Sequence, residues 1–145
     1  LPHDTDWSLK SYYKIHKFSM IVDSILLNNS FSDDFIRNCM LFLMKDSINP
    51  IWEDPKNKNG GCFSFKVANK NVPELWKKLF FYTVGNTISE NSNFLEDICG
   101  ITISPKKTFC ILKIWTKSCQ FQNPDIITNI DGLNVNGCIF KKHIN

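Results

Sequence analysis

Two runs of apolar residues, separated only by a short basic turn, constrain the fold of this chain most strongly. They are ICGITIS (98–104) and FCILKIWTKS (109–118), and the turn between them contains PKK. Both runs are rich in β-branched residues, and two such runs around a short turn favour a β-hairpin. A third segment, CFSFKVAN (62–69), has apolar residues at every second position, which is typical of a strand with one buried face. The sequence therefore predicts an antiparallel sheet.

Helical patterns occur in two other segments. Residues 18–29 (FSMIVDSILLNN) place apolar side chains three or four positions apart, as on a helix with one apolar stripe. Residues 71–85 (NVPELWKKLFFYTVG) start at a possible capping residue, Asn71, carry Pro73 in the first turn and stop at Gly85. We predict a helix in each segment.

Four further segments complete the expected elements. Residues 7–15 (WSLKSYYKI), 39–47 (CMLFLMKDS) and 136–143 (NGCIFKKH) suit strands, and residues 123–132 suit a short helix that ends at Gly132. The order of elements lacks the regular alternation of a parallel α/β sheet. We therefore predict an α+β fold, in which a curved antiparallel sheet carries helices on one face.

Length and composition fit a single globular domain over residues 1–145. The chain is 43% hydrophobic and 21% charged, and it contains no low-complexity linker or internal repeat. Its net charge of +3 allows contact with a few phosphates but does not match a protein that binds duplex DNA. No apolar run approaches the roughly 20 residues of a membrane span, and no signal peptide opens the chain. We expect a cytoplasmic monomer without a membrane partner.

The cysteines and histidines do not indicate a metal site or a cofactor. None of the six cysteines forms a CxxC pair or has a histidine at zinc-finger spacing, so we interpret them as free thiols of a reducing compartment, with disulfides as the alternative. Nucleotide-binding, hydrolase and metalloprotease motifs are also absent. The pair Gly60–Gly61 suits a turn or a bulge. The sequence gives no reason to expect an enzyme.

Aromatic and charged residues instead suggest a site for a flat cationic ring. Trp52 adjoins Glu53, Trp115 ends one predicted strand, and Lys106 and Lys107 lie in the hairpin turn before that strand. An aromatic face attracts a cation, a carboxylate accepts hydrogen bonds from ring N–H groups, and lysines can meet an attached phosphate chain. The alternative is that both tryptophans belong to the core.

The segment IWEDPKNKNGG (51–61) resembles the signature loop W-E-D-x-x-N-x-x-G-G-x-W of the messenger-RNA cap-binding translation initiation factor 4E family. The CG-to-IWT hairpin of that family is similar to residues 99–116, and its second helix is similar to LWKKLFFYTVG. The resemblance covers about residues 2–143. It implies a sheet of about eight strands, curved like a cupped hand, with three helices on the convex face.

The resemblance also implies a site for 7-methylguanine on the concave face. Trp52 matches one of the two tryptophans that stack on the base, Glu53 the carboxylate that accepts its N1 and N2 protons, and Trp115 the residue beside the N7 methyl group. The other stacking tryptophan is absent, because the loop that carries it in the family is nearly missing here. Tyr13 is the first candidate to replace it, with Tyr12 and His16 as alternatives. These side chains could equally pack in the core.

The expected phosphate contacts are altered. Lys106 matches the family's phosphate-binding arginine, but the position of a second phosphate lysine is Ile111, so Lys107 is a candidate substitute. Cys62 stands where the family has an arginine. A solvated pair of charges is the alternative explanation for Lys106 and Lys107.

On the convex face the family binds a helical peptide of scaffold proteins. The matching positions here are Pro2, Ile21, Ile25, Lys77, Lys78 and Phe81. Lysines replace an aliphatic and an acidic residue of the family, which would repel a basic peptide and favour an acidic one. The alternative is that the partner site is lost.

The leading hypothesis is a divergent cap-binding initiation factor that recruits messenger RNA through a scaffold of the 4G type or an equivalent. A competitor or translational repressor that sequesters caps without a scaffold is the second hypothesis. A third is an interaction module that has lost its ligand. The A+T-rich composition would suit a viral protein of the host cytoplasm.

Overall fold

The computed structural model describes residues 21–45 and 47–144. The helices within these ranges are α1 (Ile21–Ser30), α2 (Asp33–Asn38), α3 (Val72–Val84) and α4 (Ser92–Asp97). The strands are β1 (Leu41–Met44), β2 (Gly61–Ala68), β3 (Ile98–Pro105), β4 (Phe109–Thr116) and β5 (Ile139–Lys142). The same ranges contain three short 3-10 turns, at Asn69–Asn71, Pro124–Ile126 and Val135–Gly137.

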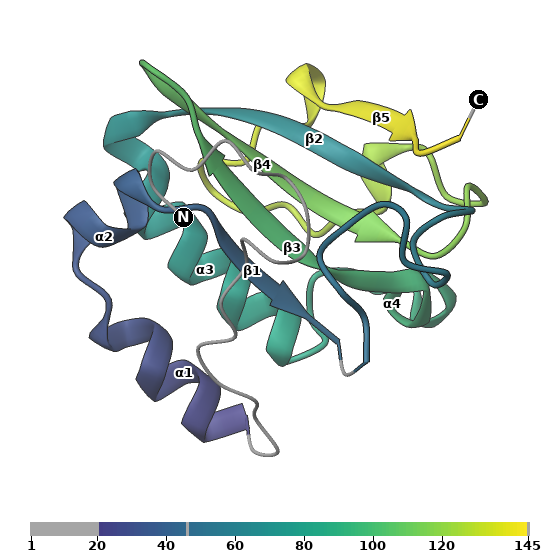
Figure 1. Cartoon of the computed structure of the whole chain (residues 1–145), viewed down its shortest axis with the longest axis horizontal. Helices are drawn as coiled ribbons and strands as arrows, with labels where there is room; N and C mark the ends of the chain where they lie inside the picture. Colours follow the sequence, from purple (N-terminus) through teal and green to yellow (C-terminus); the bar gives the residue numbers. More distant parts are fainter. Residues whose placement is uncertain (1–20, 46, 145) are drawn as a thin grey trace.

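The five strands form one antiparallel sheet in the order β1-β3-β4-β2-β5 (Figure 1). The predicted hairpin is confirmed: β3 and β4 pair with Ile101 opposite Ile114, and a register shift between Ile98 and Gly100 bends the pair near one end. On its other side β4 pairs with β2. The sheet is thus built outward from the segment that the sequence marked most clearly.

One face of the sheet packs against the helices. Side chains at alternate strand positions, such as Phe63, Leu112 and Ile114, are fully buried there together with Leu79 and Trp76 of α3. Helix α3 contacts β3, and α1 and α2 contact α3 (Figure 1). Each such apolar side chain contributes roughly 1.5–3 kcal/mol on burial, so this layer supplies most of the stability.

The opposite face carries the residues of interest, and we call it the Trp115 face. Side chains of directly paired residues lie on the same side of a sheet. Trp115 is paired with Cys62 of β2 and Gly100 of β3. Ile48, Cys62, Cys99 and Trp115 form a second, smaller apolar cluster, against which Met44 packs. All six cysteines lie in the described ranges as free thiols.

The structure corrects one predicted element. Residues 123–132 do not form a helix: only Pro124–Ile126 makes a 3-10 turn. The following residues are held instead by hydrogen bonds to the segment after α3, because the Thr128 N–H donates to the Ile88 carbonyl and the Ser89 hydroxyl donates to the Ile126 carbonyl. Buried Ile127 and Ile130 anchor the stretch to the core, so tertiary packing overrides the helical pattern.

Other differences are smaller. The described residues provide five strands of the expected eight or so, and the predicted strand over 7–15 lies outside them. Asn71 precedes α3 as expected, but its side chain makes no capping hydrogen bond. Helices α2 and α4 were not predicted, although Ser32 and Asn91 cap them by accepting from the backbone N–H three residues later.

Candidate functional site

The loop between β1 and β2 is built around the buried carboxylate of Asp54. One of its oxygens, Oδ2, accepts the Asn49 N–H at 2.9 Å, and the other, Oδ1, accepts the Lys56 N–H at 2.9 Å. Asp54 is only 6% exposed. A buried carboxylate is tolerated where hydrogen bonds satisfy it, and here these bonds hold the two sides of the loop together.

Asn57 makes a second set of cross-links inside the same loop. Its Nδ2 donates to the carbonyls of Asn49 and Ile51, both at 2.8 Å, and its side chain is completely buried. Its own carbonyl lies 2.7 Å from the Nδ1 of His143. Because a carbonyl can only accept, His143 carries its proton on Nδ1 in this contact.

The loop ends at a glycine that the packing requires. A Cβ added to Gly60 would lie 1.8 Å from the carbonyl oxygen of Thr116, the last residue of β4. The neighbouring β2 residue, Gly61, would bring a Cβ within 2.3 Å of the Lys141 carbonyl. Any other side chain would force the sheet apart here, so the double glycine allows the loop to enter the sheet close to β4 and β5.

Trp52 and Glu53 project from this fixed loop. Trp52 is 47% exposed and belongs to neither apolar cluster, and Glu53 is also exposed. Their neighbour Asp54 points inward and fixes the backbone. The loop therefore presents a half-exposed aromatic ring and an exposed carboxylate at neighbouring positions.

Trp115 lies on the sheet next to the base of the same loop. Its indole is 8% exposed, and its Nε1–H donates to the Thr102 hydroxyl at 3.0 Å. The ring of His143 contacts it, with centroids 5.1 Å apart and the planes inclined at 54°. His143 thus touches both Trp115 and the loop. Burial lowers the pKa of this histidine, the bond to Asn57 raises it and the charge of Lys113 lowers it, so the ring is neutral near pH 7.

The structure places Lys106 and Lys107 far from Trp115 along the sheet. Both lie exposed in the β3–β4 turn, where the Lys106 N–H donates to the Phe109 carbonyl. The β4 segment from Phe109 to Trp115 spans about 20 Å at the usual rise of a strand. The two lysines and the tryptophan therefore lie at opposite ends of the hairpin.

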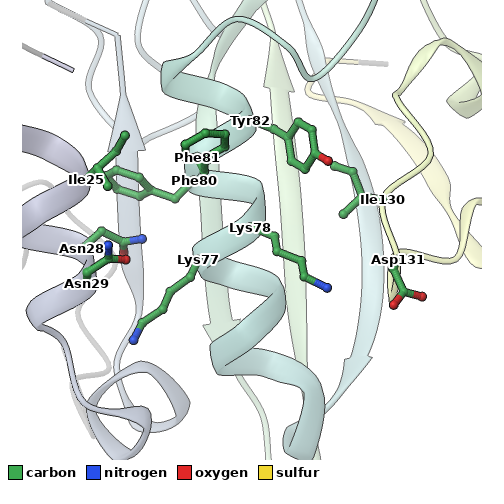
Figure 2. A pocket seen from close by; sticks show the side chains of 10 residues that line it. All are labelled: Ile25, Asn28, Asn29, Lys77, Lys78, Phe80, Phe81, Tyr82, Ile130 and Asp131. Atoms are coloured by element: carbon green, nitrogen blue, oxygen red, sulfur yellow. The ribbon is translucent and has the colours of Figure 1, made fainter. Parts of the chain in front are cut away.

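On the helical face, four of the predicted partner-binding residues line one groove of about 550 Å³. They are Ile25 of α1 and Lys77, Lys78 and Phe81 of α3. In Figure 2, Lys77 points toward α1 and Lys78 points toward Asp131 on the other side of α3. Lys78 also pairs with Glu74 at 3.2 Å.

The remaining predicted site residues cannot be placed. Pro2, Tyr12, Tyr13 and His16 lie outside the described residues. Ile21 starts α1, but its side chain is outside the described part as well.

Sequence reasoning did not single out Asp54, Asn57, Thr102 or His143. A local signal existed for Asp54, because aspartate in a turn often accepts a hydrogen bond from the backbone N–H two residues later. Here that N–H belongs to Lys56, and the arrangement is an Asx turn. The contact between His143 and Asn57 joins residues 86 positions apart, and no local pattern indicates it.

Within residues 21–45 and 47–144, no group of three or more potential ligands could hold a metal ion. In the same part of the chain, no helix has the length and apolarity needed to span a bilayer.

Comparison with known proteins decides the family. The sequence model described as eukaryotic initiation factor 4E matches residues 4–142, which is nearly the whole chain. The chain belongs to the eukaryotic initiation factor 4E family. Its α+β architecture and its WED loop agree with that membership.

Relatives include eukaryotic translation initiation factor 4E of Xenopus laevis, which is 30% identical over 80% of this chain and 55% of its own length. A homolog from Acanthamoeba polyphaga mimivirus is 35% identical over 57% of this chain and 27% of its own. The chain thus spans about half or less of the length of these relatives.

Solved structures agree in fold. Schistosome eIF4E, complexed with m7GpppG and 4E-BP, matches 74% of this chain and 60% of its own with a TM-score of 0.66 and 30% identity. C. elegans eIF4E-3, in complex with the 4E-binding protein Mextli, has a TM-score of 0.69 over 82% of this chain and 70% of its own. At 22% identity the latter supports the fold alone.

Replacing Asp54 by alanine should weaken the folded state. The change leaves two backbone N–H groups of the loop without their acceptor, which costs about 1–3 kcal/mol in the free energy of unfolding. Glu53→Ala, at the exposed neighbouring position, should change this free energy by less than about 0.5 kcal/mol. Urea unfolding measures both, and equal stabilities of the two variants would contradict the role given to Asp54.

Proposed function

We propose that this protein binds the 7-methylguanosine cap of messenger RNA on the Trp115 face. The observation that supports this most directly is the exposed Trp52 indole beside an exposed Glu53, on a loop fixed by Asp54 and Asn57. The Schistosome relative complexed with m7GpppG supports the same ligand.

The chemistry of the base matches these side chains. N7 methylation makes guanine cationic, and an indole face attracts such a ring by about 0.5–2 kcal/mol, depending on desolvation. The Glu53 carboxylate accepts the N1 and N2 protons in charge-assisted hydrogen bonds. In the described part of the chain the Trp52 backbone N–H makes no hydrogen bond, so it can donate to the guanine O6. In this proposal the Trp115 indole lies beside the N7 methyl group of the base.

A second aromatic face comes from the segment before α1. Tyr13 is our first candidate, with Tyr12 and His16 as alternatives. The lysines that the resemblance assigns to the phosphates, Lys106 and Lys107, lie about 20 Å from Trp115 along β4. The protein needs no cofactor and is not an enzyme, since binding alone accounts for these groups.

The groove on the helical face is the proposed site for a partner protein. Schistosome eIF4E, which belongs to the same family, was solved with the partner protein 4E-BP, and this supports a partner site here. Here a scaffold of the 4G type or a divergent equivalent would join the capped messenger RNA to the initiation machinery in the cytoplasm. Pro2 and Ile21 would extend the site formed by Ile25 and Phe81.

A cap-sequestering repressor without a scaffold is the second candidate function. The lysines at the groove, Lys77 and Lys78, favour it over a site for a basic scaffold peptide. Intact cap affinity without any bound scaffold in a pull-down from translation extract would decide for the repressor.

Binding of the cap should depend on methylation and on Glu53. Tryptophan fluorescence should be quenched by 7-methyl-GTP at lower concentration than by GTP. Glu53→Gln should raise the Kd for 7-methyl-GTP about 10- to 100-fold, because the charge and one acceptor are lost. The control Glu90→Gln, also at an exposed glutamate, should leave it unchanged. Equal quenching by both nucleotides would contradict the proposal.

The charge of the groove should select its peptide. An amphipathic helical peptide with acidic flanks should bind more tightly than its basic counterpart, and the double variant Lys77→Glu, Lys78→Glu should reverse this order. Lys70→Glu, at an exposed lysine outside the groove, is the control. Fluorescence anisotropy measures the affinities, and a preference unaffected by the double variant would exclude charge selection here.

A further inference from the structure

Three lysines of the sheet share the face that carries Trp115. Lys113 lies two positions before Trp115 on β4, so both side chains point to the same side. Lys66 of β2 is paired with Ile111 of β4, and Lys141 of β5 is paired with Cys62, which itself faces Trp115. The ladder of paired residues thus places all three ammonium groups on the Trp115 face.

No acidic residue balances these lysines within the sheet. The sequences of the five strands, LFLM, GCFSFKVA, ICGITISP, FCILKIWT and IFKK, contain no aspartate or glutamate. Among the described residues, the ion pairs are Arg37–Asp34 and Lys78–Glu74, and both belong to helices. Like charges without counter-charges repel each other, and a bound anion relieves this repulsion. Such a cluster is therefore typical of an anion-binding surface.

The charges of two of the lysines, Lys113 and Lys141, meet in one region beside Trp115, and Lys66 lies further along the same face. The charges of Lys113 and Lys141 both lower the pKa of the Cys62 thiol, although burial raises it more, and Lys113 also lowers the pKa of His143. The Lys66 Nζ lies 4.4 Å from the centre of the Phe109 ring, so this side chain points along the Trp115 face toward the β3–β4 turn.

A neutral donor accompanies the charges. Ser64 of β2 is paired with Lys113, so its hydroxyl lies on the same face as the Lys113 side chain. Ser64 is half-buried, and within the described part of the chain its hydroxyl forms no hydrogen bond. Hydroxyl and ammonium donors side by side suit the oxygens of a phosphate group.

We propose that Lys113 of β4 and Lys66 of β2, with Ser64 of β2 and Lys141 of the edge strand β5, bind phosphate groups of capped RNA. This inference rests on the proposed cap site, because it assigns the phosphate chain of that same ligand. The chain would leave the base near Trp115 and cross the middle of the sheet. Along β4, Lys113 lies about 7 Å from Trp115 and the partner of Lys66, Ile111, lies about 13 Å away, whereas the hairpin turn with Lys106 and Lys107 is about 20 Å away or more.

The phosphates have two possible sources in the ligand: the cap's own polyphosphate chain and the internucleotide phosphates of the following RNA. The test therefore measures the affinity of the full chain for 7-methylguanosine, its mono-, di- and triphosphate, and a short capped RNA. Lys113→Met and Lys66→Met keep the length of the side chain and remove its charge. Lys142→Met, at the neighbouring strand position whose side chain points to the other side, is the matched control.

We expect each lysine variant to raise the Kd for 7-methyl-GTP or for the capped RNA about three- to tenfold at low salt, with the nucleoside unaffected. The dependence on salt should weaken as well. Weaker binding of 7-methyl-GTP would assign the lysines to the cap phosphates. Weaker binding of the capped RNA alone would assign them to the internucleotide phosphates.

Unchanged affinity in both variants would overturn the inference, and a loss of affinity in Lys106→Met or Lys107→Met would then assign the phosphates to the hairpin turn. Failure of the cap site itself gives a different result. In that case methylated and unmethylated nucleotides would bind equally, while their affinity still fell on removal of Lys113 or Lys66.

Discussion

The arrangement of this site depends on the hydrogen bonds that Asp54 and Asn57 make inside the β1–β2 loop. A polar loop of this length would ordinarily be mobile, and a ligand would have to order it on binding. Here a buried carboxylate and a buried amide tie Asn49, Ile51 and Lys56 together at 2.8–2.9 Å. Ordering occurs during folding instead. The neighbouring Trp52 and Glu53 then remain available to a ligand.

The antiparallel sheet separates the two proposed binding surfaces of the protein. Because side chains alternate between its faces, one set of residues forms the core with α3 and the other set forms the Trp115 face. Trp115 and Ile114 are adjacent in sequence but belong to different apolar clusters. The helical face is left with the groove beside Lys77 and Lys78. The proposed nucleotide site and the proposed partner groove thus lie on opposite sides of one layer.

Local patterns predicted the elements that local physics determines. The hairpin of β3 and β4, strand β2 and helix α3 follow from alternation, β-branched runs and helical spacing. The expected helix over 123–132 failed because buried Ile127 and Ile130 and the bond from Thr128 to Ile88 fix that stretch in another form. Contacts between distant residues, such as His143 with Asn57, have no local signal.

In the candidate site, too, some residues could be predicted from local sequence patterns and others could not. Trp52, Glu53 and Trp115 were identified from a motif that the chain shares with its family, whereas the position of Lys113 beside Trp115 was visible only once the strand register was known. The alternation along FCILKIWT already contained this information, since residues two apart on a strand share a face. The alternation alone does not show that the face with Lys113 and Trp115 is the one turned away from the helices.

The central claim is that the Trp52 indole stacks on a methylated guanine whose edge is bound by Glu53. A crystal structure of the protein with 7-methyl-GTP tests it most directly. We predict that the base lies flat on this indole, with the Glu53 carboxylate within hydrogen-bonding distance of N1 and N2. An indole packed into the protein, with the nucleotide bound elsewhere, would contradict the account.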